Sequence, residues 1–128
     1  MDINPWQAQL RKGAAELVVL SLLAGGERYG LEILERAGGD GRVLSDGSIY
    51  PLLTRLERDG KLKARWVMAE GAKVPRKYYR LTQEGLELVA AMQRIWLEFS
   101  TFVSGAIEEA NDGKRPARPG RTIPLRAV

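Results

Sequence analysis

The chain has 128 residues, of which 45% are hydrophobic and 28% are charged, and its formal net charge is +4. This length favours one domain with appendages, and no stretch is apolar for long enough to span a membrane. The first residues lack the apolar core of a secretory signal, so we expect a cytoplasmic protein. Cysteine and histidine are both absent. Disulfides, thiol chemistry and imidazole ligands are thereby excluded, and we expect no metal site and no cofactor.

The positive charge is concentrated in two segments. Residues 55–80 carry nine basic and three acidic side chains, and residues 112–128 carry five basic and one acidic. Residues 1–54 and 81–111 are both net acidic. A basic segment focused in this way is typical of a surface that binds a polyanion. The alternative is a solvated surface on which the charge is merely uneven.

The first third of the chain is predicted to contain two helices. Residues 10–24 have helical periodicity, with one apolar side formed by Leu10, Ala14, Leu17, Val18 and Leu22. Residues 29–37 predict a second, shorter helix that buries Leu31 and Leu34, with Ile33 as a further candidate. A glycine-rich loop then leads to Ser45.

The stretch GSIYPLLTRLERDG, residues 47–60, predicts a third helix, although it opens with glycine and contains a proline. Its core stripe consists of Ile49, Leu52, Leu53 and Leu56. We expect Ser45 to cap the amino end and Gly60 to end the helix. Pro51 comes slightly late for a proline in the first turn, so a kink or a start nearer Ser48 is left open.

After this helix the apolar period changes from helical spacing to strict alternation. Residues 61–68 predict a half-buried strand whose inward side is Leu62, Ala64, Trp66 and Met68, with Trp66 in the core. Residues 76–82 predict a second strand with Tyr79 and Leu81 inward and Arg80 outward. Together they form a hairpin with a basic outer face.

Three helices followed by a hairpin is the order of a winged helix-turn-helix module. A strand before the third helix is missing or too short to detect from the sequence. We therefore expect a mainly α (α+β) fold in three parts. These are a winged helix-turn-helix DNA-binding domain with an N-terminal helix at 1–81, a long C-terminal dimerisation helix at 82–110, and a basic, disordered tail at 111–128.

The outer face of the third helix offers a reason for its poor start. Gly47 lets a backbone amide approach a phosphate closely. Ser48, Tyr50 and Pro51 form a small tip with a hydroxyl and an aromatic ring, which suits base edges in a major groove. Arg55, further along the helix, suits a phosphate or a guanine. The alternative is that Gly47 and Pro51 only shape the entrance to the helix.

The segments YGLEILERA, LSDGSIYPLLTRLERDGKL and RKYYRLTQEG resemble the PadR family of bacterial winged-helix transcriptional regulators over about residues 10–108. The resemblance implies a homodimer that binds a dyad-symmetric operator in double-stranded DNA and usually represses a neighbouring gene. It implies that Tyr29 and Gly30 lie near the DNA backbone and that Ser48, Tyr50 and Pro51 begin the recognition helix. The wing would carry Lys73, Arg76 and Lys77.

The last helix, at 83–110, is expected to be capped by Thr82. It has more apolar surface than one chain of this size is expected to cover. Heptad spacing joins Leu88, Met92, Ile95, Phe99, Phe102 and Ala106, and a second line joins Val89, Trp96 and Val103. We expect a second copy to cover this surface, with the first helix of the same chain as the alternative. The predicted dimerisation residues are Leu88, Met92, Ile95, Trp96, Phe99, Phe102 and Val103.

Trp96 has two interpretations. It is favoured as an anchor of the dimer interface, because aromatic side chains bury a large area. Some PadR relatives are thought to stack flat aromatic effectors against a tryptophan in this region, so Trp96 and Phe99 are also candidates for an effector site. Trp6 is a further candidate wall if the N-terminal segment crosses to the partner.

The sequence therefore predicts a sequence-specific DNA-binding transcriptional regulator. We expect a repressor of a nearby gene that acts as a homodimer on a dyad-symmetric operator, and release by a small aromatic effector is a further hypothesis. The alternative is a winged-helix protein-interaction module that does not read DNA. No nucleophile–base pair, metal cluster or phosphate loop favours an enzyme, and no catalytic residues are predicted.

Overall fold

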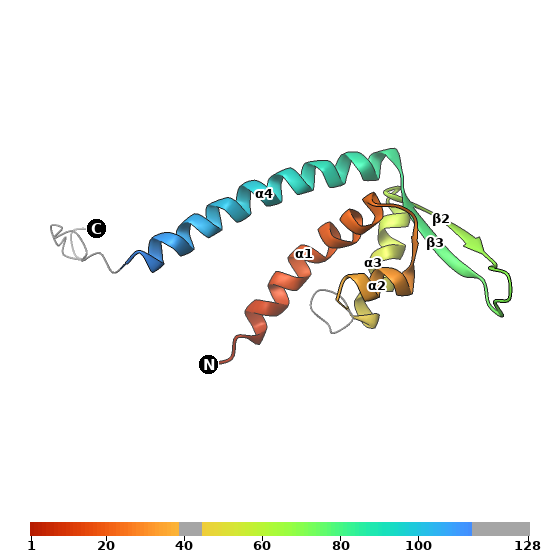
Figure 1. The fold of residues 1–128 in the computed structure, drawn as a ribbon, viewed down its shortest axis with the longest axis horizontal. Coiled ribbons are helices and arrows are strands. Elements are labelled where there is room, and N and C mark those ends of the chain that lie inside the picture. The colour runs from red at the N-terminus through yellow and green to blue at the C-terminus, as the bar shows by residue number, and fades with distance from the viewer. Residues whose placement is uncertain (39–44, 114–128) are drawn as a thin grey trace. The chain divides into compact units, whose positions relative to one another are not determined.

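The computed structural model describes residues 1–38 and 45–113, which form four helices and a small antiparallel sheet (Figure 1). The elements are α1 (Asn4–Ala24), β1 (Arg28–Tyr29), α2 (Gly30–Arg36), α3 (Asp46–Arg58), β2 (Leu62–Val67), β3 (Arg76–Leu81) and α4 (Gln83–Asn111). One compact unit comprises Met1–Arg94, and a second begins at Ile95. Nearly all of the tail predicted at 111–128 lies outside the described residues.

The sheet has the strand order β1-β3-β2, with β3 in the centre and antiparallel to both neighbours. Leu62 pairs with Leu81 at the inner end of the β2–β3 hairpin, and Val67 pairs with Arg76 near its tip. The predicted order of three helices and a hairpin is confirmed. The additional strand, β1, precedes α2 and is only two residues long, too short to leave a periodic signal in the sequence.

Helix α1 begins at Asn4, six residues before the predicted start, with a proline in its first turn. A proline is tolerated there because the first N–H groups have no intrahelical partner. The predicted apolar side was only partly right, because Leu17, Val18 and Leu22 pack against the core but are only partly buried. The buried side chains are Val19, Leu20 and Leu23, whereas Leu10 is 47% exposed. Apolar residues surround the second half of this helix, so their spacing alone did not select the face that packs.

Helix α2 is shorter than predicted, and one of its expected core residues is exposed. Ile33 and Leu34 are buried, but Leu31 faces outward. The amino end is closed by the carboxylate of Glu32, which accepts a hydrogen bond from the Tyr29 backbone N–H at 3.4 Å. With only seven residues, the helix has too few turns for its apolar stripe to be read from sequence.

The amino end of α3 follows the prediction for Ser45 but not the later start considered near Ser48. Ser45 is the N-cap, and its backbone N–H donates to the Ser48 Oγ at 3.0 Å. The helix begins at Asp46, so Pro51 is its sixth residue and lies inside it. Pro51 has no N–H to donate to the carbonyl of Gly47, and one helical hydrogen bond is missing in the second turn.

The carboxyl end of α3 is closed as expected by Gly60, whose φ of 76° lies in the left-handed region that glycine adopts without strain. The Lys61 N–H donates to the Leu56 carbonyl at 2.9 Å, and the Gly60 N–H donates to the Glu57 carbonyl at 3.1 Å. These two bonds are the Schellman pattern. They turn the chain directly into β2 and so fix the hairpin against the end of α3.

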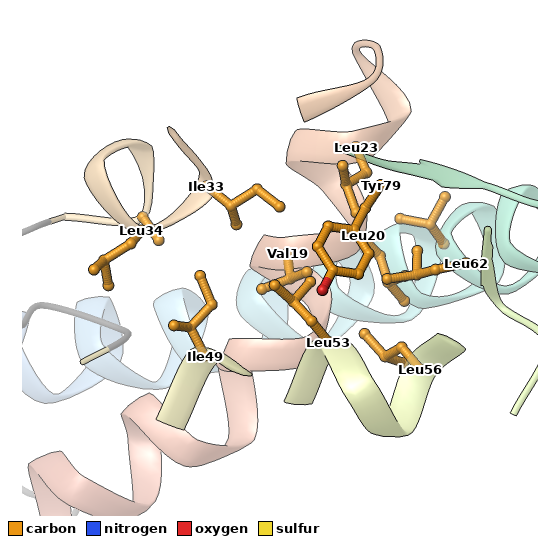
Figure 2. Packing of buried hydrophobic residues seen from close by; sticks show 12 residues of the cluster. Val19, Leu20, Leu23, Ile33, Leu34, Ile49, Leu53, Leu56, Leu62 and Tyr79 are labelled. Atoms are coloured by element: carbon orange, nitrogen blue, oxygen red, sulfur yellow. The ribbon is translucent and has the colours of Figure 1, made fainter. Parts of the chain in front are cut away.

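The core joins α1, α2 and α3 to the inner end of the hairpin and to the start of α4 (Figure 2). The predicted stripe of α3 is confirmed, since Ile49, Leu53 and Leu56 are buried and Leu52 packs at the edge. The remaining buried side chains are Val19, Leu20, Leu23, Ile33, Leu34, Ala37, Leu62, Tyr79 and Val89. The winged helix domain is thus one hydrophobic core built from both helices and strands.

Trp66 does not belong to this core, which corrects the prediction from strand alternation. Its side chain is 67% exposed, and Met68 beyond it is exposed as well. The hairpin extends past the helices of the first unit (Figure 1), so the inward side of β2 leaves the core after Ala64. Tyr79 and Leu81 of β3 are buried or partly buried, as predicted.

Helix α4 ends at Asn111, one residue beyond the prediction, and Thr82 caps its start. The Gly85 N–H donates to Thr82 Oγ1 at 3.1 Å, and this hydroxyl donates to the Gly60 carbonyl at 2.6 Å. Leu88 and Met92 pack against the core of their own chain. Within the described residues, no helix is both long and apolar enough to cross a membrane.

Candidate nucleic-acid interface

A hollow of about 380 Å³ lies where α2, α3 and the hairpin meet, and we call it the aromatic hollow. Its walls include Tyr29, Gly30, Tyr50, Trp66, Arg76 and Lys77. Apart from Trp66, all of these were predicted from the sequence to bind DNA. The fold therefore brings together side chains from three separate segments of the chain.

Arg76 and Lys77 are neighbours in β3, so their side chains leave opposite faces of the sheet. Both nevertheless line the aromatic hollow. β1 ends at Tyr29 opposite Tyr78, so Arg76 and Lys77 lie beyond the part of β3 that pairs with β1.

Tyr50 is seated on the amino end of α2. A Cβ atom added to Gly30 would come within 2.9 Å of the Tyr50 Cε1 atom, which is closer than real contacts allow. Glycine at this position thus makes room for the ring, and the ring remains 48% exposed. Gly30 therefore helps to orient an aromatic side chain on the face of α3 that was predicted to read bases.

Arg76 lies over the ring of Tyr29, with its guanidinium carbon 4.6 Å from the ring centroid. The ring of Tyr29 in turn packs against that of Tyr78 at a centroid distance of 5.4 Å. The flat face of a guanidinium stacks on an aromatic ring while its N–H groups stay available at the edge. Among the residues that the structure describes, no carboxylate lies within ion-pair distance of Arg76.

Lys77 is held differently, because its ammonium group already has a carboxylate partner. Its Nζ donates to Glu57 Oε1 of α3 at 3.0 Å and lies 5.3 Å from the ring centroid of Tyr79. The hydrogen bond to Glu57 raises the pKa of Lys77 above its usual value, although desolvation opposes the shift. Lys77 thus ties the hairpin to α3 in addition to lining the aromatic hollow.

On its other side, α3 faces α1 across a second hollow of about 610 Å³. Ser48 and Arg55 line this side, together with Arg11, Lys12 and Glu16 of α1. Arg55 is 3.5 Å from the Glu16 carboxylate, and the Ser48 hydroxyl donates to the Ser45 carbonyl at 3.1 Å. Both groups therefore have partners within the chain.

The remaining predicted DNA contacts are exposed but do not converge with the others. Gly47 and Pro51 lie on the surface of α3, and no atom would lie within 4 Å of a Cβ added at Gly47. Lys73 is exposed in the turn between β2 and β3. All three positions are therefore accessible to a partner.

Two functional features of this region were missed by the sequence analysis. Trp66 was assigned to the core but forms a wall of the aromatic hollow, opposite Lys77 in the strand pairing. Glu57 was counted only as charge on α3, yet it pairs with Lys77. No local sequence pattern signals either feature, because both depend on how far the hairpin extends from the core.

In the second unit, the predicted dimerisation residues are exposed. Apolar side chains lie open along α4 from residue 95 to 107, the most exposed being Phe102 at 75%. This exposed set is Ile95, Trp96, Leu97, Phe99, Phe102, Val103 and Ile107. At the amino end of α1, Trp6 is also exposed.

Three helices with a short strand, a hairpin wing and a cationic aromatic face next to α3 define a winged helix-turn-helix protein. The sequence matches the model of the transcriptional regulator PadR-like family over residues 19–91. Since this match covers more than half of the chain, the protein belongs to the PadR-like family. This is a family of transcriptional regulators, so the expectation of a protein that is not an enzyme is confirmed.

Individual relatives agree with this assignment. The transcriptional regulator Rv3488 of Mycobacterium tuberculosis is 29% identical over 97 residues, which are 76% of this chain and 89% of that protein. The structure of a PadR family regulator from Eggerthella lenta is 31% identical with a TM-score of 0.70, covering 83% of this chain and 92% of that one. A PadR-like regulator from Bacillus cereus is also 31% identical, with a TM-score of 0.69 and coverages of 77% and 96%.

Proposed function

We propose that this PadR-like protein binds double-stranded DNA sequence-specifically and represses a nearby gene as a homodimer on a dyad-symmetric operator. The observation that carries DNA binding is the convergence of Tyr29, Tyr50, Arg76 and Lys77 on one hollow beside α3. A cationic surface beside an exposed helix is what phosphate contacts and base readout require together.

Dimerisation through α4 is supported by its exposed apolar side chains between residues 95 and 107. Monomeric proteins rarely leave a contiguous apolar surface of this kind in water, and a second copy would cover it by symmetry. We assign dimerisation to residues 82–110, and DNA binding to residues 1–81. Leu88 and Met92 already pack against their own core, so we expect them to contribute less to the dimer than the exposed residues from 95 to 103.

A small aromatic effector belongs to the same proposal. Trp96 and Phe99 are both exposed on α4 and offer flat apolar surface. A cavity bounded by these side chains in the dimer would suit a flat aromatic molecule. Titration of the protein with small aromatic compounds should quench its tryptophan emission, and Trp96→Phe should reduce that response.

The proposal is tested by footprinting the purified full chain on the DNA upstream of its own gene. We expect two protected half-sites whose centres lie about one helical turn apart, or a multiple of it. Arg76→Ala should weaken binding to every duplex, whereas Tyr50→Ala should lower the ratio of specific to non-specific affinity. Arg36→Ala removes an exposed cation at the end of α2, outside the hollow and the dimerisation segment, and provides a charge-matched control that should have no effect.

Two results would reject the proposal. The first is a solution mass of one chain at micromolar concentration, with no association when duplex is added. The second is the absence of protection or a mobility shift on any genomic fragment. Retention of an acidic protein partner together with that second result would instead favour the protein-interaction module.

A further inference from the structure

We propose that the aromatic hollow seats one sugar-phosphate unit of the DNA backbone, with Arg76 as the phosphate ligand and Trp66 as a wall against the deoxyribose. This inference rests on the proposed function and adds Trp66 to the DNA-binding residues. A contact of this kind affects the affinity for every DNA sequence and does not discriminate between bases.

The position of the hollow follows from the geometry of a duplex. The two grooves of DNA are separated by a sugar-phosphate backbone. If α3 lies in the major groove and the neighbouring hairpin contacts the same duplex, the backbone that borders the groove must pass between α3 and the hairpin. The aromatic hollow is the space between them, with Tyr50 on its α3 side and Trp66 on its hairpin side.

The charges of the hollow fit a single phosphate. None of the described residues that line it is acidic. Lys77 is already paired with Glu57 at 3.0 Å, so its charge is largely compensated within the protein. Arg76 is stacked over Tyr29 and has no carboxylate partner among the described residues. Its guanidinium is therefore oriented by the ring and keeps N–H donors for two phosphate oxygens.

The exposed indole ring of Trp66 is suited to pack against the deoxyribose. A tryptophan that is 67% exposed on a strand loses nothing by meeting an apolar surface, and the carbon face of deoxyribose is such a surface. The Lys77 Nζ lies 5.9 Å from the centroid of the Trp66 ring, which helps to hold the indole beside the hollow. An aromatic side chain that contacts sugar discriminates little between sequences, unlike one that contacts base edges.

The test compares Trp66→Ala with Met68→Ala in the full-length protein, because Met68 is an exposed apolar residue just beyond the end of β2 that does not line the hollow. Binding is measured by fluorescence anisotropy on the footprinted operator and on a random duplex. We expect Trp66→Ala to lose about fivefold or more in affinity for both duplexes, with their ratio unchanged, and Met68→Ala to lose less than about twofold.

Three further measurements separate direct contact from a structural effect. Adding duplex should quench the emission of the native protein more than that of Trp66→Phe. The slope of log affinity against log salt concentration should be unchanged in Trp66→Ala and should fall by about one in Arg76→Ala. In an operator scanned with neutral methylphosphonate linkages, one position in each half-site should weaken the native protein but not Arg76→Ala.

The possible failures are distinguishable. If the native protein binds the operator but Trp66→Ala binds it equally well, with equal quenching in Trp66→Phe, the inference is wrong and the proposed function stands. A change in the ratio of specific to random binding would also overturn it, because Trp66 would then read bases. If the native protein binds no duplex, both this inference and the proposed function are wrong. Equal thermal midpoints of Trp66→Ala and the native protein would exclude misfolding as the cause of any loss.

Discussion

The inner and outer halves of the β2–β3 hairpin share one alternating pattern but have different environments. Leu62 at the inner end is 2% exposed, whereas Trp66, four residues along and on the same side of β2, is 67% exposed. Alternation assigns a side chain to one face of a strand, but it carries no information about where the core beneath that face ends.

The inner half of the hairpin mainly stabilises the fold, and the outer half is mainly available for binding. The inner half packs against α1, α3 and α4, so substitutions there should lower the free energy of unfolding. The outer half packs less against its own chain: Trp66 is exposed, and Arg76 has no carboxylate partner among the described residues, although Lys77 is paired with Glu57. Substitutions at Trp66 and Arg76 should therefore change binding and leave the fold intact.

The largest effect is expected from Leu62→Ala. Removing a fully buried leucine should lower the free energy of unfolding by about 2–5 kcal/mol, through lost transfer energy and the cavity left behind. Denaturant titration at a fixed protein concentration measures this. Trp66→Ala is the control on the same strand and should change stability by less than about 0.5 kcal/mol. Similar losses for both variants would abolish the distinction between the two halves.

Gly85→Ala should have the next largest effect on stability, because Gly85 lies where the first turn of α4 packs against the start of the hairpin. A Cβ at this position would collide with the backbone carbonyl oxygen of Lys61, which also accepts a hydrogen bond from the Thr82 N–H at 3.0 Å. Overpacking of this kind should lower stability by about 1–3 kcal/mol. Gly13→Ala in α1 meets nothing within 4 Å and should instead raise stability by about 0.5–1 kcal/mol. Thermal or denaturant unfolding of the two variants decides between these signs.

Gly30→Ala should act on DNA binding through Tyr50. The added methyl would displace the tyrosine ring, a flexible group, so the loss of stability should be small while operator affinity falls. A double-mutant cycle with Tyr50→Ala should give a coupling energy of about 0.5–1 kcal/mol in operator binding. Additive losses would mean that Gly30 contacts DNA itself rather than orienting Tyr50.

The smallest effect is expected in the dependence of stability on pH. The hydrogen bond to Glu57 raises the pKa of Lys77, and burial raises the pKa of Tyr79. A pKa that is higher in the folded state contributes stability below the unfolded value, and this is lost as pH rises through the folded value. Native protein should therefore lose stability above about pH 10, where lysine and tyrosine ordinarily titrate.

Lys77→Met isolates the lysine share of that loss. The variant should be less stable than the native protein at pH 8, and the difference should shrink as pH is raised past about 10.4. Unfolding by urea at a series of pH values provides the measurement. A difference that stays constant from pH 8 to pH 11 would show that Lys77 contributes only through packing of its aliphatic stem.

The sequence by itself determined the order of the elements, the stripe of α3 and the caps of α3 and α4. Ile49, Leu53 and Leu56 could be predicted because helical spacing over several turns admits one face. Ser45, Gly60 and Thr82 could be predicted because capping is local chemistry that involves residues close in sequence. The charge of the wing and the apolar excess of α4 were likewise plain in the sequence, since both are properties of composition.

Only the tertiary structure decided which of several apolar faces is buried and which charged groups are already paired. Leu10, Leu31 and Trp66 were assigned to the core because their spacing fits, yet burial depends on elements distant in sequence. The partners of Lys77 and Arg55 lie on other helices, so no local pattern could reveal them. The aromatic hollow is lined by residues of β1, α2, α3 and the hairpin, so it forms only when these elements pack together.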